Sequence, residues 1–232
     1  MKIIADISLR DIDKLFSVLD GFDDFSVKYL ETNNIKHEFI YDADILLVRS
    51  QTLINERLLS SSNIKWIGSA TAGVDHIDIK FLESKNINWF NAQGCNAYSV
   101  CNYVLSSLYE LKKDKIYKNT DMLGIVGYGN IGSQVSVLAE SLGMRVIYYD
   151  IEKKLPLGNA IEKRTLRDLV GQADIITLHI PANRQTEQLI NKQLLKSFKK
   201  GAILINFARG EVVDLIAVEK ALRDEQLGGA AI

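Results

Sequence analysis

A glycine-rich segment near the middle of the chain carries the most specific chemical signal. Gly127, Gly129 and Gly132 have the spacing G-x-G-x-x-G, between the apolar run 122–126 and a stretch of helical periodicity. In that context the spacing is typical of dinucleotide binding. The first glycine permits a sharp turn out of a strand, the second lets the backbone approach a pyrophosphate, and the third lets a helix lie close to the sheet. The first N–H groups of that helix have no helical partner and can bind the phosphates.

An acidic residue follows this segment at a distance that suits a dinucleotide. The apolar run 146–149 ends at Asp150, which lies 18 positions beyond Gly132. A carboxylate there accepts hydrogen bonds from the ribose hydroxyls of NAD and repels the additional phosphate of NADP. The strand, glycine turn, helix, strand and acid together predict an NAD site. The alternative is a glycine turn that serves packing alone.

Three further polar positions follow predicted strands. Arg209 comes after the last complete strand, and its guanidinium could grip a substrate carboxylate with two parallel hydrogen bonds. Ser50 and Thr71 lie in hydroxyl-rich segments that follow two apolar runs of the N-terminal part, and such segments can bind an oxyanion. Ligands of open parallel sheets bind beyond the carboxyl ends of the strands, so all three positions could face a substrate. The alternatives are a surface arginine and ordinary turn chemistry.

The three histidines are candidates for acid/base chemistry because imidazole titrates near neutral pH. His37 lies in a polar stretch and is expected to be exposed, His76 opens a predicted helix, and His179 ends a predicted strand. The sequence assigns no carboxylate partner to His76 or His179. We therefore expect structural roles for both.

The elements that position these residues form two rounds of strand and helix. Apolar strands interleaved with helices predict parallel sheets that are covered on both faces. In the first round we predict strands at 3–5, 26–30, 45–48, 64–67 and 88–90, and helices at 12–19, 55–59 and 79–85. After a long helix at about 96–111, we predict strands at 122–126, 146–149, 175–179 and 202–207, with helices after the glycine turn and at 165–170, 191–198 and 215–227.

The predicted fold is therefore α/β, with two doubly wound parallel-sheet lobes. The first lobe is expected at 1–94 and is flavodoxin-like, and a helix and linker occupy 95–117. The second lobe, at 118–232, is expected to be a Rossmann NAD-binding domain, with 228–232 as the start of another strand. Ligands are expected in the cleft between the lobes.

Composition excludes several classes of function. The chain has 232 residues, of which 47% are hydrophobic and 25% charged, and its net charge is −1. It therefore offers no electrostatic basis for binding nucleic acid or an anionic membrane. No apolar run approaches the roughly 18 residues of a membrane span, and the N-terminus lacks the core of a signal peptide. Cys95 and Cys101 are too few for a disulfide framework or a metal cluster, so we expect a cytoplasmic protein without a metal.

At this point the sequence resembles the D-isomer-specific 2-hydroxyacid dehydrogenases, a family of two-lobed, NAD-dependent enzymes. The segments LLVRSQT, ATAGVDHID, GYGNIG, HIP and GAILINFARGEVVD follow one another in the order found in that family. The resemblance implies that Arg209 is the catalytic arginine and that Ser50 and Thr71 contact the substrate. It implies a cofactor site for NAD made by Gly127, Gly129, Asn130, Ile131, Gly132, Asp150, Ile180, Phe207, Ala208 and Arg209.

Two segments narrow the resemblance within the family. IGSATAGVDHID and QGCNAYSVCNYVLSSL are most similar to the erythronate-4-phosphate dehydrogenases. That similarity implies oxidation of 4-phospho-D-erythronate to 2-oxo-3-hydroxy-4-phosphobutanoate in pyridoxal phosphate biosynthesis. It also implies a small phosphorylated hydroxyacid as substrate and a homodimer for the full-length enzyme.

Two other segments depart from that subfamily. Gln93 replaces a usual proline, and the segment 182–187 resembles the wider family, including the phosphoglycerate dehydrogenases. A phosphoglycerate or other 2-hydroxyacid dehydrogenase is therefore the alternative.

In the family, an Asp cofactor contact, a catalytic Glu and an acid/base His follow the strand that begins at 228, whereas this sequence ends at Ile232. We therefore expect a Rossmann domain that is incomplete at its C-terminus and negligible turnover by these residues alone. A hypothesis of another class is a non-catalytic, NAD-sensing module similar to the corepressors built on this fold.

Overall fold

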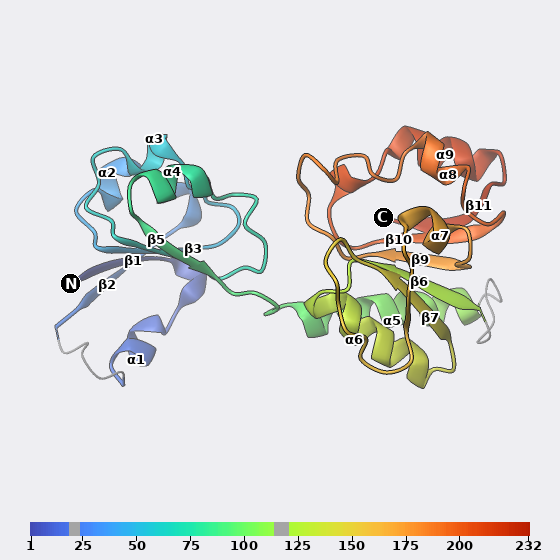
Figure 1. Cartoon of the computed structure of the whole chain (residues 1–232). Helices are drawn as coiled ribbons and strands as arrows, with labels where there is room; N and C mark the ends of the chain where they lie inside the picture. The colour runs from blue at the N-terminus through green and yellow to red at the C-terminus, as the bar shows by residue number, and fades with distance from the viewer. Residues whose placement is uncertain (19–23, 114–120) are drawn as a thin grey trace. The chain divides into compact units, whose positions relative to one another are not determined.

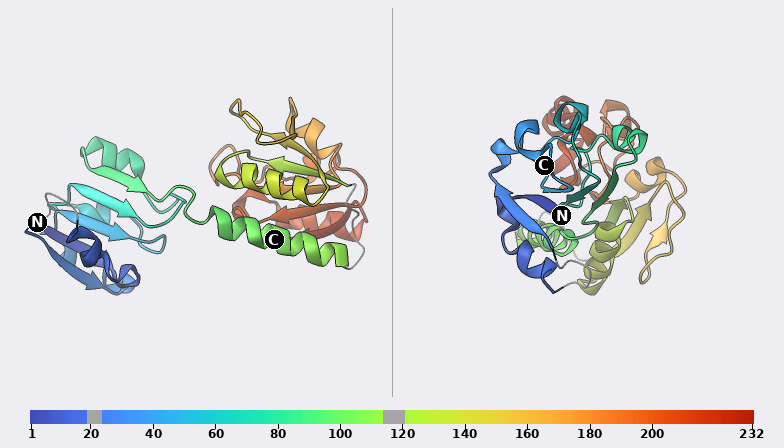
Figure 2. Two further views of the ribbon diagram at one scale, coloured as in Figure 1. Left: turned by 90° about the horizontal axis from the view of Figure 1, so that it is seen from below. Right: turned by 90° about the vertical axis from the view of Figure 1, so that its left-hand side faces the viewer.

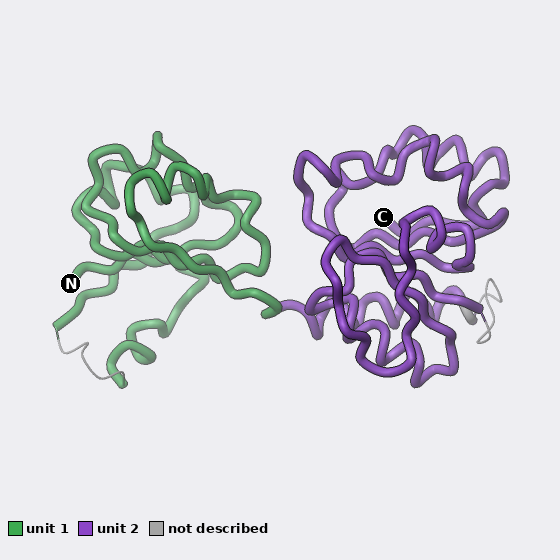
Figure 3. The backbone as a smooth tube through the Cα atoms, in the orientation of Figure 1, with its two compact units in different colours: residues 1–95 green, residues 96–232 purple. Residues whose placement is uncertain are grey.

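The computed structural model describes residues 1–18, 24–113 and 121–232 (Figure 1). The chain divides into two compact units, residues 1–95 and residues 96–232 (Figure 3). The predicted linker at 114–117, residue 118 at the start of the predicted second lobe, and the predicted helix end at 19 lie outside the described residues.

Unit 1 contains a five-stranded parallel sheet. Its strands lie in the order β2-β1-β3-β4-β5. They are β1 (Lys2–Asp6), β2 (Ser26–Leu30), β3 (Ile45–Val48), β4 (Trp66–Ser69) and β5 (Asn88–Asn91). This is the flavodoxin-like order, in which the chain winds outward in both directions from a switch point between β1 and β3.

Short helices cover both faces of this sheet (Figure 1). They are α1 (Ile12–Phe16), α2 (His37–Ile40), α3 (Glu56–Leu59) and α4 (Ile79–Ser84), with 3-10 turns η1 (Ile7–Leu9) and η2 (Thr32–Asn34). Ile40, Leu59 and Leu82, one from each of α2 to α4, are buried in a single cluster with residues of one sheet face. Ile12 and Phe16 of α1 pack on the opposite face.

Unit 2 contains a six-stranded parallel sheet of order β11-β10-β9-β6-β7-β8. The strands are β6 (Met122–Val126), β7 (Arg145–Tyr149), β8 (Ile161–Glu162), β9 (Ile175–Leu178), β10 (Ala202–Asn206) and β11 (Leu227–Ala231). Counted along the unit, this is the Rossmann order 3-2-1-4-5-6, with its switch point between β6 and β9.

The helices of unit 2 also form two layers (Figure 1, Figure 2). They are α5 (Ala97–Lys113), α6 (Asn130–Ser141), α7 (Leu166–Val170), α8 (Lys192–Leu195) and α9 (Leu215–Arg223), with the 3-10 turn η3 (Gly210–Val212). Val104 of α5 and Val135 of α6 are buried on one face of the sheet. Leu169, Leu194 and Val218, from α7, α8 and α9, are buried on the other. Across the described ranges, no helix is long and apolar enough to cross a membrane.

Side-chain caps explain where several of these helices begin. Asn55, Asp78, Thr165, Asn191 and Asp214 each precede a helix and accept a hydrogen bond from a backbone N–H of its first turn. Such a bond satisfies one of the amides that have no helical partner. Polar residues at these positions therefore fix the lengths of the preceding strand-to-helix connections.

The predicted fold class is confirmed: both units are α/β with parallel sheets, and the second has the Rossmann order. Several element boundaries differ from the prediction. Strand β4 begins at Trp66 rather than at residue 64, because Trp66 is the residue that pairs with Ile45. Helix α9 ends at Arg223, since Glu225 has a positive φ of 53° and Leu227 belongs to β11. The sequence did not indicate α2 or β8, which have four and two residues.

Candidate functional site

Backbone packing requires two of the three glycines of the G-x-G-x-x-G segment. Gly127 follows β6 with φ +92°, and a Cβ there would lie 2.5 Å from the carbonyl oxygen of His179. A Cβ on Gly132 would lie 2.0 Å from the carbonyl oxygen of Gly127. These contacts hold the start of α6 against the turn, as the sequence predicted for the first and third glycines. A side chain at either position would force the backbone apart.

The remaining glycine is different. A Cβ on Gly129 would meet no described atom within 4 Å. Gly129 is also the N-cap of the twelve-residue helix α6, and it provides no capping side chain. The start of α6 is therefore left open at this point, where its N–H groups and dipole favour an anion. Nothing within the described chain explains the lack of a side chain at Gly129, which is what a closely approaching ligand would require.

A pocket of about 550 Å³ lies beyond the carboxyl ends of β6, β7 and β9, at the switch point of the sheet. Its volume is in the range of cofactor and ligand sites. It is lined by Val126, Gly127, Gly129, Tyr149, Asp150, Ile151, Glu152, Lys154, Leu166, His179, Ile180, Pro181, Asn183, Gln185, Thr186 and Leu189. The pocket thus brings together four of the predicted cofactor residues, namely Gly127, Gly129, Asp150 and Ile180.

Asp150 is held at the end of β7 by two backbone hydrogen bonds. Its Oδ2 accepts from the backbone N–H of Tyr128 at 2.7 Å, and its Oδ1 accepts from that of Glu152 at 2.9 Å. Each carboxylate oxygen has a second lone pair, so the group can still accept from ribose hydroxyls. The bond to Tyr128 ties the acid to the middle of the glycine turn, a link between distant positions that the sequence did not reveal.

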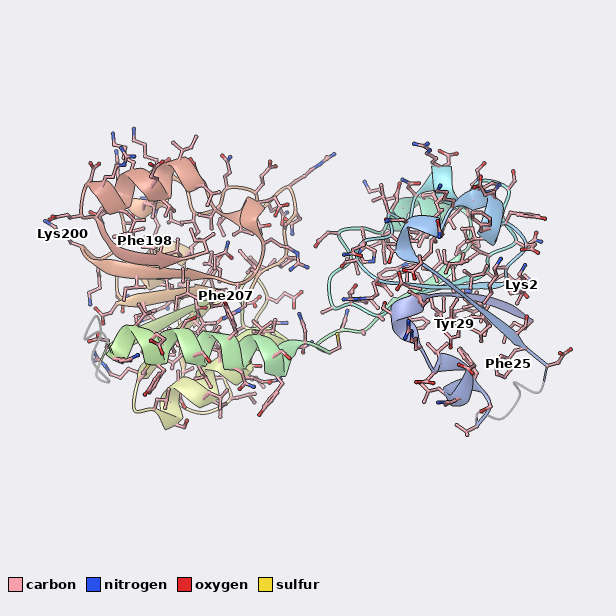
Figure 4. The ribbon with its side chains drawn as sticks, turned by 180° about the vertical axis from the view of Figure 1, so that it is seen from behind. Lys2, Phe25, Tyr29, Phe198, Lys200 and Phe207 are labelled. Atoms are coloured by element: carbon pink, nitrogen blue, oxygen red, sulfur yellow. The ribbon has the colours of Figure 1, made fainter. Side chains whose placement is uncertain are left out.

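The predicted residues after β10 form a tight turn. The side chain of Asn206 closes it, because Nδ2 donates to the carbonyl of Arg209 at 2.8 Å and Oδ1 accepts from the N–H of Ala208 at 3.1 Å. Phe207 is labelled in Figure 4. Its ring meets that of Tyr103 in α5 edge-on, with the ring centroids 4.6 Å apart. Arg209 is exposed, and its Nη1 donates to the carbonyl of Ala208 at 2.9 Å. The sequence prediction did not identify Asn206, although an Asn directly after an apolar strand is a known turn former.

The other predicted cofactor residues, Asn130, Ile131 and Gly132, form the first turn of α6. None of these three residues is among those that line the pocket. A contribution from these residues would come from backbone N–H groups at the helix start.

His179 lines the pocket but is poorly suited to proton transfer. Its Nε2 lies 3.0 Å from Oγ1 of Thr177, and its Nδ1 is buried with no hydrogen-bond partner among the described residues. Burial lowers the pKa of His179 to about 4. The ring is therefore neutral at pH 7, which supports the expected structural role.

In unit 1 the predicted substrate residues follow neighbouring strands. Val48 pairs with Ser69 in the sheet, so Ser50 and Thr71 leave it at the same edge. Ser50 is exposed and Thr71 is half-buried. The structure therefore brings the two hydroxyl-bearing segments to one edge of unit 1, as the strand order requires.

A chain of hydrogen bonds connects Thr71 to a buried histidine. Oγ1 of Thr71 lies 2.8 Å from Oγ of Ser69, which lies 2.9 Å from Nε2 of His76. Burial lowers the pKa of His76, and the nearby charge of Asp75 opposes that shift without cancelling it. His76 lies in the turn before α4 and does not open the helix as predicted, because Asp78 is the N-cap. His37 is exposed, with Nδ1 at 3.2 Å from the carbonyl oxygen of Leu58.

Comparison with known proteins places this geometry in context. Residues 108–232 match the family described as D-isomer specific 2-hydroxyacid dehydrogenase, NAD binding domain. The chain is 38% identical over 229 residues to the D-3-phosphoglycerate dehydrogenase of Haemophilus influenzae, a match that covers 90% of this chain and 56% of that protein. It is 36% identical over 231 residues to the erythronate-4-phosphate dehydrogenase of Acinetobacter baumannii, covering 97% of this chain and 63% of that protein.

A solved structure is similar over nearly the whole chain. The NAD+-bound 3-phosphoglycerate dehydrogenase of Entamoeba histolytica superposes with a TM-score of 0.83 at 26% identity, covering 98% of this chain and 78% of that one. The chain spans 56% and 63% of the length of the two curated relatives named above.

Proposed function

The chain belongs to the family of D-isomer specific 2-hydroxyacid dehydrogenases, and we propose that it serves the NAD-dependent oxidation of a small phosphorylated 2-hydroxyacid. Its C-terminal part is the NAD-binding domain of that family. The observation that carries the proposal is the open position at Gly129, beside a pocket of about 550 Å³ at the switch point of a Rossmann sheet.

The residues of unit 2 fit a dinucleotide. The start of α6 would bind the pyrophosphate, because its N–H groups and dipole face the space beside Gly129. Asp150 would accept from the ribose hydroxyls of the adenosine, in the position that its two backbone bonds fix. NAD, when bound, accepts a hydride from the carbon that bears the substrate hydroxyl. Phe207, Ala208 and Arg209 lie in the turn after β10 that we assign to the nicotinamide end.

Arg209 is proposed to bind the substrate carboxylate. A guanidinium binds a carboxylate with two parallel hydrogen bonds, and its charge draws electron density from the neighbouring carbon. The turn that Asn206 closes fixes the backbone on both sides of Arg209. In unit 1, Ser50 and Thr71 are proposed to contact the substrate, and the bonds of the Thr71 hydroxyl to Ser69 and to the carbonyl of Gly73 would orient it.

We propose 4-phospho-D-erythronate as the substrate, with 3-phospho-D-glycerate as the second candidate. The first rests on the similarity to the Acinetobacter enzyme and on the segments around Thr71. The second is favoured by the 38% identity to the Haemophilus enzyme. We further propose a cytoplasmic, homodimeric enzyme for the full-length protein.

A polypeptide of residues 1–232 is expected to bind NAD and to turn over substrate negligibly. His76 is buried and bonded to Ser69, and a pKa of about 4 makes the ring of His179 a weak base, so neither is suited to exchange a proton with a substrate hydroxyl. A positioned acid or base contributes typically 10²- to 10⁴-fold to the rate.

The test is NADH production with each of the two phosphorylated acids. One sample is the polypeptide of residues 1–232, and the other is a fusion to the remaining C-terminal segment of the Acinetobacter relative. We expect turnover by the fusion, with a higher kcat/KM for 4-phospho-D-erythronate. Turnover of neither acid by the fusion would contradict the proposed function, and equal rates for both samples would contradict the assignment of the two histidines.

A further inference from the structure

The loop that follows Asp150 is fastened to the body of unit 2 at two points. The hydroxyl of Tyr148 donates to the backbone carbonyl of Lys154 at 2.9 Å. The hydroxyl of Tyr128 accepts from the backbone N–H of Leu157 at 3.1 Å. Both tyrosines are buried, and their rings stack with centroids 4.0 Å apart. The backbone at Lys154 is therefore held in a defined position, and its side chain extends from there along the wall of the pocket.

Lys154 is held by an acid on the same wall. Its Nζ lies 2.5 Å from Oε2 of Glu152, and both residues line the pocket together with Asp150. Among the described residues that line this pocket, Lys154 is the one lysine or arginine. Hydrogen bonding to Glu152, and the charges of Glu152 and Asp150, raise the pKa of Lys154. The lysine is thus a full cation whose charge is directed to an acidic neighbour.

This arrangement bears on the choice between the two nicotinamide dinucleotides. NADP differs from NAD by a phosphate at the 2′ position of the adenosine ribose, which is the group that an acid after the second strand faces. A lysine on the same wall would attract that phosphate through a charge-assisted hydrogen bond. Glu152 already pairs with this lysine.

We propose that Glu152 is a second determinant of cofactor specificity in this protein, because it pairs with Lys154 and so withholds from a 2′-phosphate the cation that could bind it. Asp150 repels the phosphate directly, whereas Glu152 acts through the lysine. The proposal rests on NAD as the cofactor and is independent of the identity of the hydroxyacid.

The pair is accessible to mutation without loss of the fold. The Glu152 side chain is 71% exposed, and exposed ion pairs contribute little to stability. Glu152→Gln keeps the size of the side chain and removes its charge. The matched control is Glu219→Gln, which breaks another exposed pair, with Arg223 at 2.6 Å in α9, away from the pocket residues.

The experiment measures Kd for NADH and for NADPH by calorimetry at low ionic strength. We expect Glu152→Gln to lower the ratio of the NADPH Kd to the NADH Kd by about twofold to fivefold, because the lysine no longer has to leave an exposed ion pair, whose contribution of about 0.5–1 kcal/mol converts to that ratio. Adding Lys154→Met to Glu152→Gln should return the ratio to the wild-type value. Raising the salt concentration should reduce the gain, and Glu219→Gln should leave the ratio unchanged.

Two results would overturn the proposal alone. One is an unchanged ratio in Glu152→Gln, and the other is a gain that persists after Lys154→Met, which would mean that removing a negative charge is sufficient. Failure of the wild-type protein to bind NADH would overturn the cofactor assignment and, with it, this proposal.

Discussion

The two parallel sheets differ in the turn that follows the first strand beside their switch points. In unit 2, the turn after β6 is built from glycine, and the space beyond β6 and β9 forms a pocket of about 550 Å³. In unit 1, β1 borders the switch point as β6 does in unit 2, and it ends at Asp6, whose side chain is buried. Its carboxylate accepts from the backbone N–H of Ser8 at 2.9 Å, from the hydroxyl of Ser8, and from Oγ1 of Thr32 at 2.5 Å.

The strand order creates a potential ligand site in each sheet. The side chains of the turns beside it determine whether a ligand can enter. Open parallel sheets bind ligands where the strand order reverses, because the connections diverge there. In unit 1 the turn after β1 is closed by the Asp6 carboxylate, which accepts from three donors. The absence of a side chain at Gly129 leaves the corresponding turn accessible in unit 2. We therefore assign the cofactor to the unit 2 switch point.

The largest effects are expected from substitutions of Gly129 and Gly132, two glycines of the turn after β6 in unit 2. Gly129→Val should reduce NADH affinity by at least about 100-fold, because the branched side chain would occupy the space in which the pyrophosphate approaches the backbone. It should cost about 1 kcal/mol of stability, the scale of a lost N-cap preference. Gly132→Val should instead prevent folding of unit 2, since its Cβ would lie 2.0 Å from a backbone oxygen.

Circular dichroism and NADH calorimetry on both variants separate the two effects. If Gly129→Val bound NADH as tightly as the wild type, the G-x-G-x-x-G segment would serve packing alone. A folded, stable Gly132→Val would contradict the packing assigned to the start of α6.

A smaller effect, on stability, is expected from protonation of His179, a half-buried histidine that lines the pocket. The pKa of His179 is about 4 in the folded protein and about 6.5 in an unfolded chain, because burial disfavours the charged ring. The unfolded chain therefore binds the additional proton as the pH falls from 6.5 towards 4. The stability linked to the neutral form of His179 is therefore fully present above pH 6.5. The free energy of unfolding falls by about 3 kcal/mol between pH 6.5 and pH 4.

Urea unfolding of unit 2 at pH 7, 5.5 and 4.5 measures this decline in the wild type and in His179→Gln. The glutamine variant should lose much less stability over the same range. Equal slopes in the two proteins would exclude His179 as the source of the pH dependence.

The third effect concerns the acid at the end of β7. Asp150→Ser should lower the preference for NADH over NADPH by roughly 10- to 100-fold, taking a charge-assisted contact at about 1.5–3 kcal/mol. Serine keeps an oxygen that can accept from the N–H of Tyr128. Calorimetric titration with both dinucleotides measures the ratio, with Glu219→Gln as the control. Equal affinity for NADPH and NADH in the unmodified protein would contradict the role assigned to Asp150.

The smallest effect is expected at the turn after β1. Thr32→Val removes the hydroxyl that donates to Asp6 while keeping the shape of the side chain, so unit 1 should lose about 1 kcal/mol of stability. Burial alone would raise the pKa of Asp6, but the bonds from Ser8 and Thr32, with the charge of Arg49, lower it overall. The stabilisation by this carboxylate is therefore present above its ordinary pKa and is lost as the pH falls below it.

Hydrogen exchange of the unit 1 amides measures the change in Thr32→Val, and NADH affinity should be unaffected. A change in NADH affinity would mean that the unit 1 switch point takes part in cofactor binding and would remove the contrast between the units.

Much of the fold could be predicted from the sequence. Strands β2, β3 and β6 have the predicted bounds, and the last two are apolar runs flanked by polar residues or glycine. The spacing of the glycines likewise predicted the sharp turn at Gly127, where φ is +92°, and the close packing at Gly132. Elements of two to four residues, such as β8 and α2, contain too few residues to show a period, so tertiary packing decides them.

The site was less accessible to sequence reasoning because its contacts join distant positions. Asp150 was predicted from its place after a strand, but its bond to Tyr128 depends on β6 and β7 being neighbours. The link from Ser69 to His76 spans a turn whose geometry no motif specifies. The pairing of Asp6 with Thr32 depends on β1 and β2 lying side by side. In each case the residue type was visible and its partner was not.

A protein-observed NMR titration with NADH tests the central claim most directly. With isotope-labelled residues 1–232, we predict saturable shifts that are largest at the amides of Gly129, Asn130 and Ile131 and at Asp150, around the open switch point of unit 2. The amides of Ser8 and Thr32, the two residues that donate to Asp6 in unit 1, should shift least. No saturable shift in unit 2, or larger shifts at Ser8 and Thr32 than at Gly129, would contradict the account.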